Sequence, residues 1–163
     1  MKTYQVFLGL GSNLGDKQKN IERAYKEIEK RIGKIVSKSA FYVSPPDGFE
    51  SENQFVNTVC RVVATLNPRQ VLQQTQEIEK KLGRTKKSSD GKYADRVIDI
   101  DILMFDNLII EEPGLLIPHP RFHRREFVLV PFAEISPDTI HPVLGKSIRR
   151  LTPPAAASDG LPV

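Results

Sequence analysis

Cysteine, tryptophan and long apolar runs are scarce or absent in this chain of 163 residues. The single cysteine, Cys60, excludes an internal disulfide and a thiolate metal cluster, and its apolar neighbours predict a small buried side chain. No apolar run approaches the length of a membrane span, and the N-terminus lacks a signal-peptide pattern. We therefore expect a cytoplasmic protein that has no membrane partner.

Internal repeats are also absent, and the length suits a single domain. We place this domain over residues 1–151 and expect a loose tail over residues 152–163, which is rich in proline, alanine and small polar residues. The net charge of +4 is a modest excess that suits either nucleic acid or a small polyanion. The chain shows neither a Ser-His-Asp order nor an activated thiol, which argues against covalent catalysis.

The most informative stretch runs from Arg96 to Phe105 and is predicted to be a buried strand that carries two carboxylates. Because side chains alternate along a strand, Asp99 and Asp101 should project from the same face. The same alternation predicts that Leu103 and Phe105 share this face, and it places on the opposite face Ile98, Ile100, Ile102 and Met104.

Two acids in this arrangement either face water on an edge strand or converge on a pair of divalent cations. Cationic and imidazole side chains on both sides of the strand favour a site for metal ions and a polyphosphate. They are Arg84, Lys86, Lys87, Lys92 and Arg96 before the acids, and His119, His123, Arg124 and Arg125 after them.

A first strand is predicted over residues 3–10, followed by the glycine-rich stretch Gly9–Gly15. This stretch matches neither phosphate-loop signature, so a tight turn that needs glycine is a better interpretation than a phosphate cradle. A helix should begin after Asp16 as N-cap and end at Gly33. Its buried face is predicted to hold Ile21, Ala24, Tyr25, Ile28 and Ile32.

Two further strands are predicted over residues 35–43 and 54–65. The loop over residues 44–53 between them is long for a compact domain, which indicates a functional loop. Phe55 and Asn57 share one face of the second of these strands. This pair either stacks on and hydrogen-bonds a flat heterocycle or forms a partly exposed polar face, and the residues alone leave both possibilities open.

A second helix is predicted from the Asn67 cap to Leu82, with Gly83 ending it. Gln76 and Glu79 lie on one edge of this helix and, taken alone, should be solvated. The resulting order is strand, helix, strand, strand, helix, strand. It predicts a ferredoxin-like α+β sandwich, with an antiparallel sheet, helices on one face, and long loops that build a site on the other face.

Five motifs in this order resemble the 6-hydroxymethyl-7,8-dihydropterin pyrophosphokinase family over essentially the whole chain, from Gly9 to about Leu151. The motifs are Gly11-Ser12-Asn13-Leu14, Phe41-Tyr42-Val43-Ser44-Pro45-Pro46, Phe55-Val56-Asn57, Arg96-Val97-Ile98-Asp99-Ile100-Asp101-Ile102-Leu103, and Pro118-His119-Pro120-Arg121.

The resemblance implies an enzyme of folate biosynthesis that uses ATP as co-substrate. It would transfer a pyrophosphoryl group to the hydroxymethyl group of the dihydropterin, giving the pterin diphosphate and AMP. The resemblance also implies two Mg²⁺ ions and small-molecule substrates rather than nucleic acid, and we expect a monomer.

Site residues follow from the resemblance position by position. Asp99 and Asp101 would bind the metal ions and, with Arg84 and Arg96, form the catalytic set. The ATP-binding residues would be Gln76, Glu79, Arg84, Lys87, Arg96, Ile100, Ile102, His119 and Arg125. The pterin-binding residues would be Ser44, Pro45, Pro46, Phe55, Asn57, Tyr93, Asp99 and Phe127.

The chain departs from the family pattern at three positions. Lys86 replaces an arginine, which turns a bidentate phosphate contact into a point charge. Tyr93 stands where some members carry tryptophan, and Asp95 adds a negative charge beside Arg96. We expect these differences to affect closure and rate more than the class of reaction.

Two rival functions remain open. A two-metal nucleotidyltransferase with a palm-like fold would attack the α-phosphorus and release pyrophosphate. A non-enzymatic RNA-binding sandwich would also be basic, but it would need paired aromatic side chains on its central strands, and here Phe55 stands alone.

Overall fold

A computed structural model of the protein describes residues 2–45, 54–83, 97–154 and 161–162. Its elements are β1 (Tyr4–Ser12), α1 (Lys17–Arg31), β2 (Gly33–Lys38), β3 (Tyr42–Ser44), β4 (Phe55–Ala64), α2 (Pro68–Leu82), β5 (Asp99–Phe105), β6 (Ile110–Glu112), β7 (Leu115–Ile117), a 3₁₀ turn (Phe122–Arg124), α3 (Glu126–Ile135), α4 (Ile148–Leu151) and β8 (Leu161–Pro162).

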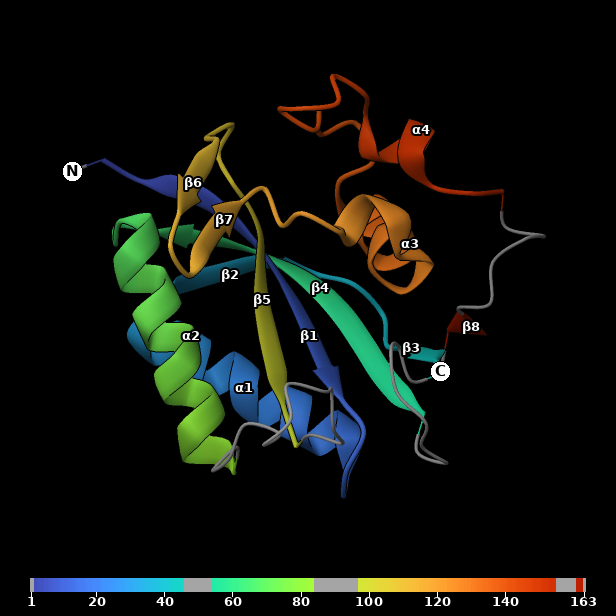
Figure 1. The fold of residues 1–163 in the computed structure, drawn as a ribbon. Helices are drawn as coiled ribbons and strands as arrows, with labels where there is room; N and C mark the ends of the chain where they lie inside the picture. Colours follow the sequence, from blue (N-terminus) through green and yellow to red (C-terminus); the bar gives the residue numbers. More distant parts are fainter. Residues whose placement is uncertain (1, 46–53, 84–96, 155–160, 163) are drawn as a thin grey trace.

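An antiparallel sheet organises these elements, with strand order β5-β1-β4-β3-β8 and with β2 also paired to β4. Strands β2 and β3 follow one another along the same edge of β4, since they pair with residues 60–64 and 55–57 respectively. The strand predicted over residues 35–43 is therefore interrupted. With α1 and α2 as the connections, the order confirms the ferredoxin-like sandwich (Figure 1).

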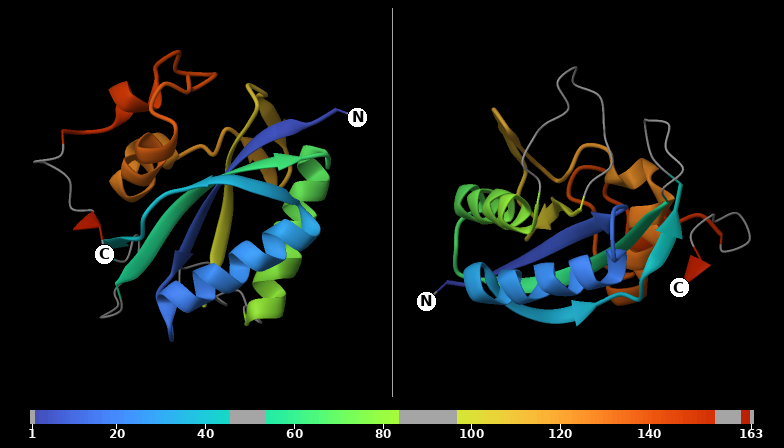
Figure 2. Two further views of the ribbon diagram at one scale, coloured as in Figure 1. Left: turned by 180° about the vertical axis from the view of Figure 1, so that it is seen from behind. Right: turned by 90° about the horizontal axis from the view of Figure 1, so that it is seen from below.

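Local signals define the two long helices as predicted. Asp16 Oδ1 accepts a hydrogen bond from the Lys19 N–H, and Asn67 and Gln70 form a reciprocal capping box. The apolar sides of both helices enter the first core cluster, together with β1 and β5 side chains such as Leu8 and Ile100. Helix α1 lies behind β1 and β5 in Figure 1 and in front of them in the rear view of Figure 2.

A second core cluster lies on the opposite face of the sheet, where α3 packs. Phe132 of α3 stacks on Phe7 of β1 with ring centroids 4.6 Å apart, and Phe122 packs against Phe132 at 5.6 Å. Val59 and Leu103 complete the sheet side of this cluster. The second face, for which the sequence predicts only long loops, is therefore covered by a helix over part of its length.

Strand β5 contains a bulge opposite β1. Phe7 pairs with Met104 and Leu8 pairs with Ile102, which leaves Leu103 as an extra residue. Beyond the bulge the alternation reverses, so Met104 enters the second cluster and Phe105 the first. The predicted faces of Met104 and Phe105 are therefore wrong, because one inserted residue moves every later side chain to the other face.

The glycine-rich stretch is also different from the tight turn predicted over Gly9–Gly15. Strand β1 continues through Ser12, so Gly9 and Gly11 are strand residues. Within this stretch only Gly15 has a positive φ, of 70°. The loop that follows the strand is tied to α1, because the Asn20 amide donates to Ser12 Oγ at 3.2 Å and to the Leu14 carbonyl at 2.8 Å.

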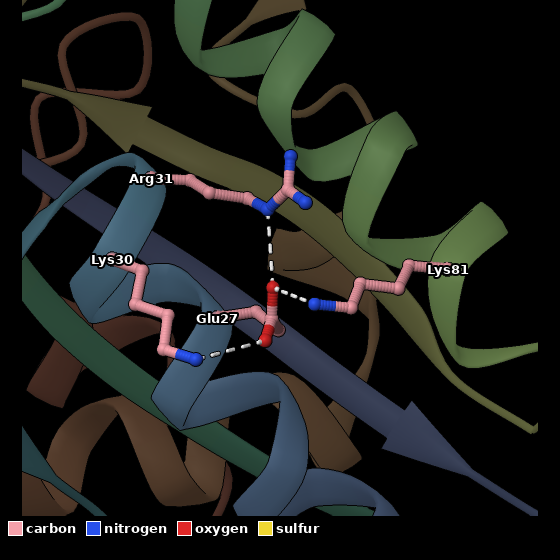
Figure 3. Close-up of polar contacts among 4 residues, drawn as sticks. All are labelled: Glu27, Lys30, Arg31 and Lys81. Carbon is pink, nitrogen blue, oxygen red and sulfur yellow. Dashed lines mark hydrogen bonds and ion pairs between the residues drawn. The ribbon is translucent and has the colours of Figure 1, made fainter.

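A carboxylate between α1 and α2 joins the two helices (Figure 3). Glu27 Oε1 accepts hydrogen bonds from Lys81 Nζ at 3.0 Å and from Arg31 Nε at 3.1 Å, and Lys30 lies 3.8 Å from Oε2. The hydrogen bonds from Lys81 and Arg31 lower the pKa of Glu27. This ion-pair cluster links the helices at the surface of the first core.

The last described residues extend the sheet, because Leu161 and Pro162 of β8 pair with Val43 and Tyr42. Two residues of the predicted tail thus have a strand partner, and the boundary at residue 151 stays a prediction. Among the helices within the described ranges, none combines the length and apolar character needed to span a membrane.

Candidate active site

Two glycines of β1 pair with the acids of β5, and one of them also pairs with a polar residue of β4. Gly9 and Gly11 pair with Asp101 and Asp99 on β5. On the other side, Gly11 pairs with Asn57 on β4. Paired residues share a face of the sheet, so the acids and the amide lie on one face. The Leu103 side chain lies over Gly9, where an added Cβ would be 3.3 Å from Leu103 Cδ2. Neighbouring strands lie roughly 4.8 Å apart, so β5 and β4 are separated by about 10 Å across β1.

The side chains of Phe55 and Asn57 lie over Gly11. A methyl group added at Gly11 would lie 3.2 Å from Asn57 Oδ1 and 3.3 Å from Phe55 Cδ1. The predicted aromatic and amide pair is therefore brought together on the same face as the acids. Because Gly11 has no side chain, the Phe55 and Asn57 side chains can lie over the β1 backbone at this point.

A hydrogen bond with Ser44 holds the Asn57 amide in place. Asn57 Nδ2 donates to Ser44 Oγ at 2.6 Å, and both residues are buried. With Nδ2 at Ser44, the amide oxygen Oδ1 lies on the side of Gly11 as an acceptor. The resemblance implies that Ser44 binds the pterin, and the structure gives its side chain a contact that positions Asn57.

Tyr42 and Glu134 support this part of the site and were not identified from the sequence. The Tyr42 hydroxyl donates to the Glu134 carboxylate of α3, which also accepts the Ala40 backbone N–H at 3.0 Å. Burial, followed by this contact with Glu134, raises the pKa of Tyr42 to about 12. Because Tyr42 pairs with Asn57, the contact holds β3 and the Asn57 position to α3. The one sequence signal was that Tyr42 lies two residues before Ser44, and residues two apart on a strand share a face of the sheet.

Asp99 and Asp101 are both partly exposed at the start of β5, as expected for acids that remain accessible to a ligand. Within the described ranges, no group of three His, Cys, Asp or Glu side chains could enclose a metal ion. Two carboxylates without a third ligand do not suit a closed structural zinc site. They do fit Mg²⁺, which keeps several waters and is commonly held by one or two carboxylates together with substrate phosphates.

Glu79 is not solvated, contrary to the expectation for this residue taken alone. It is 7% exposed, and its Oε2 accepts the backbone N–H of Ile100 at 2.8 Å. Gln76, three residues earlier on α2, is exposed. The edge of α2 that was predicted to be solvated therefore carries one buried carboxylate, Glu79, and one exposed amide, Gln76.

The side chains of Ile100 and Ile102 lie in the first core cluster. A ligand on the face of the acids could reach these two residues only through their backbone. Of the residues assigned to the pterin, Pro45 is exposed at the end of β3. Phe127 lies in the first turn of α3 and packs against the second cluster.

His119 follows the β6–β7 hairpin and is tied to β5, because its backbone N–H donates to the Leu103 carbonyl at 2.9 Å. Burial, followed by the positive charge of Arg125, lowers the pKa of His119 to about 4, with Asp99 opposing this shift. His119 Nδ1 accepts the Arg121 N–H at 3.1 Å, so the neutral ring carries its proton on Nε2. At neutral pH this side chain therefore offers an uncharged donor near Asp99.

Arg125 supplies the positive charge beside His119. Its guanidinium also lies over the Phe127 ring, 5.7 Å from the centroid. Five assigned residues lie outside the described ranges, and their roles stay predictions: Pro46, Arg84, Lys87, Tyr93 and Arg96. The departures at Lys86 and Asp95 lie there too.

Comparison with protein families finds one family whose sequence model matches most of the chain. The model of 7,8-dihydro-6-hydroxymethylpterin-pyrophosphokinase (HPPK) matches residues 7–137. A 2-amino-4-hydroxy-6-hydroxymethyldihydropteridine pyrophosphokinase of Porphyromonas gingivalis is 42% identical over 138 residues, which cover 84% of this chain and 93% of the relative. The protein of the same name from Aquifex aeolicus is 36% identical over 91% of this chain and 90% of its own length.

Solved structures support the same fold. Plasmodium falciparum HPPK-DHPS, solved with pteroate, superposes with a TM-score of 0.75 at 18% identity, over 92% of this chain and 44% of that chain. Another HPPK-DHPS structure, solved in complex with substrates, has a TM-score of 0.76 at 16% identity and covers 93% of this chain. This chain thus spans less than half of those solved chains.

Proposed function

This chain belongs to the 7,8-dihydro-6-hydroxymethylpterin-pyrophosphokinase family, and we propose from this premise that it transfers the pyrophosphoryl group of ATP to 6-hydroxymethyl-7,8-dihydropterin. The hydroxymethyl oxygen forms a bond to the β-phosphorus, and the bond from that phosphorus to the oxygen it shares with the α-phosphorus breaks. The products are AMP and the pterin diphosphate, and the hydroxyl proton is released.

The arrangement across β1 is the observation that supports the proposal most. Backbone at Gly9 and Gly11 separates a carboxylate pair on β5 from an aromatic and amide pair on β4. One side suits metal-bound phosphates, and the other suits a flat heterocycle that bears hydrogen-bond donors. A substrate hydroxymethyl group that extends from the heterocycle toward β5 would point toward the acids.

On the heterocycle side, Phe55 would stack against the pterin ring, and Asn57 Oδ1 would accept a hydrogen bond from its edge. The hydrogen bond with Ser44 would hold this amide in place beside the ligand. We also place Pro45, Pro46, Tyr93 and Phe127 at the pterin, on the strength of the family resemblance. Fixing the ring in this way would align the hydroxymethyl oxygen before reaction.

On the phosphate side, Asp99 and Asp101 would hold two Mg²⁺ ions. Bound there, these ions would neutralise the triphosphate and stabilise the negative charge that develops in the transition state. Around the phosphates we place Arg84, Lys87, Arg96, His119 and Arg125. The neutral His119 would donate through Nε2, while Arg125 would contribute positive charge.

Product analysis tests this proposal directly. The protein is incubated with Mg²⁺, ATP and 6-hydroxymethyl-7,8-dihydropterin, and nucleotides and pterins are separated by chromatography. We expect AMP and a pterin diphosphate in equal amounts, and no product when the pterin is omitted. A matched reaction with EDTA should stop turnover and leave the fold intact by circular dichroism.

The rival functions give different results in the same assay. Release of inorganic pyrophosphate with a nucleotidyl product would identify the nucleotidyltransferase. Salt-dependent binding of RNA without nucleotide turnover would identify the RNA-binding protein.

A further inference from the structure

Strand β5 has β1 on only one side in the described sheet, so its other edge needs partners from elsewhere. In an antiparallel strand, alternate residues direct their backbone N–H and C=O toward opposite edges. The N–H of Ile100 is directed to Glu79 of α2, at 2.8 Å from Oε2. A helix side chain thus takes the place of a neighbouring strand at this point.

Ile100 is the residue between the two acids. Asp99 and Asp101 project from one face, and the Ile100 side chain enters the first core cluster on the other. The backbone at Ile100 therefore sets the spacing and direction of both carboxylates. Their Cα atoms lie roughly 6–7 Å apart along the pleat, so a small rotation at Ile100 moves the two side chains relative to one another.

Glu79 itself is firmly placed. It is 7% exposed, and its helix is packed against the sheet through Val71 and Ile78, which are fully buried. Two residues later, Lys81 ties the helix to Glu27 of α1. Figure 1 shows α2 running beside β5. The hydrogen bond to Ile100 therefore joins the acid-bearing strand to a rigid part of the core.

We propose that Glu79 is a positioning residue, which holds Asp99 and Asp101 in the geometry for paired Mg²⁺ ions by fixing the β5 backbone at Ile100. This inference rests on the proposed function for its catalytic part. It differs from the ATP contact that the family resemblance implies for Glu79, because the effect is transmitted through the strand. Groups outside the first ligand shell commonly control how well metal ligands are oriented.

The test uses two substitutions and a control on the full chain. Glu79→Ala removes the acceptor, and Glu79→Gln keeps an oxygen that can accept the Ile100 N–H. Glu77→Ala, which removes an exposed carboxylate from the same helix, is the matched control. Thermal unfolding and circular dichroism establish that each variant folds.

The first readout needs neither ligand nor turnover. Amide hydrogen exchange at Ile100 in the free protein should accelerate about tenfold in Glu79→Ala, and should stay within about threefold of the parent in Glu79→Gln and Glu77→Ala. Equal protection of Ile100 in Glu79→Ala and the parent would overturn the proposal.

The second readout separates positioning from a contact with ATP. In Glu79→Ala, the Mg²⁺ concentration for half-maximal turnover should rise about tenfold, with kcat reduced, while ATP affinity at saturating Mg²⁺ changes less than about twofold. Glu79→Gln should restore most of the Mg²⁺ response. Loss of ATP affinity in both variants with an unchanged Mg²⁺ requirement would show a direct nucleotide contact and overturn the proposal. If the parent itself formed no AMP, the proposed function would fail, while the exchange at Ile100 would still report on Glu79.

Discussion

Gly11 contributes to the site through the side chain that it lacks. Its backbone φ is not in the left-handed region, so alanine is compatible with the strand at this position. The added methyl group would meet Asn57 Oδ1 at 3.2 Å and Phe55 Cδ1 at 3.3 Å, the two groups proposed to hold the pterin. We expect Gly11→Ala to weaken pterin binding at least about tenfold, because both contacts would be displaced.

Calorimetric titration of Gly11→Ala with the pterin and, separately, with an ATP analogue checks this expectation. The affinity for the nucleotide and the unfolding midpoint should stay close to those of the parent. Unchanged pterin affinity would show that the ligand does not depend on the positions of Phe55 and Asn57 over Gly11.

Asp99 and Asp101 can be tested with nearly isosteric amides. Asp99→Asn or Asp101→Asn removes the charge that would hold Mg²⁺ and keeps the shape of the side chain. We expect AMP formation to fall about a thousandfold or more in either variant. The free energy of unfolding should change by less than about 1 kcal/mol, because both acids are partly exposed. Retained Mg²⁺-dependent turnover in either variant would remove that acid from the site.

The ion-pair cluster at Glu27 acts at the scale of elements, because it joins α1 to α2. The pKa of Glu27 is lowered in the folded protein, chiefly by Lys81 and Arg31. A lowered folded pKa means that the stabilisation is present above the unfolded value of 4.5 and is lost as the pH falls through the folded pKa. We expect Glu27→Gln to reduce the free energy of unfolding by about 1 kcal/mol at pH 7, since its partners are largely solvated.

Urea unfolding at several pH values measures this effect. The difference between the parent and Glu27→Gln should shrink below about pH 4.5, as Glu27 becomes protonated in both states. Glu22→Gln, at an exposed position on the same helix, is the control and should show no such difference. A difference that is constant from pH 7 to pH 3 would show that packing, rather than charge, explains the effect.

At the scale of the whole molecule, the domain boundary near residue 151 can be tested by shortening the chain. Strand β8 pairs with β3 at two positions only, whereas β3 also pairs with β4 along its full length. A chain that ends at Pro154 should therefore fold, with an unfolding midpoint within about 4 °C of the parent. The shortened chain should form AMP at a rate within about threefold of the parent's rate. Loss of cooperative unfolding would place the tail inside the domain.

Local and periodic properties of the sequence determined much of this protein. Caps at Asp16 and Asn67 define where the helices begin, and their apolar spacing defines which side is buried. The order of elements was sufficient to predict the ferredoxin-like sheet. The spacing of Asp99 and Asp101 placed both acids on one face, because alternation along a strand depends only on neighbouring residues.

Tertiary structure decided how distant segments act on one another. The bulge at Leu103 reversed the faces of Met104 and Phe105, because register depends on the partner strand and not on the strand's own pattern. Glu79 is buried where it accepts the backbone N–H of Ile100 at the edge of β5. No local pattern in α2 indicates that this N–H lies beside Glu79. The low pKa of His119 likewise comes from burial and from Arg125, and both depend on the folded arrangement. Short-range periodicity thus predicted the elements and one face of the site, while long-range packing determined the surroundings that give its groups their properties.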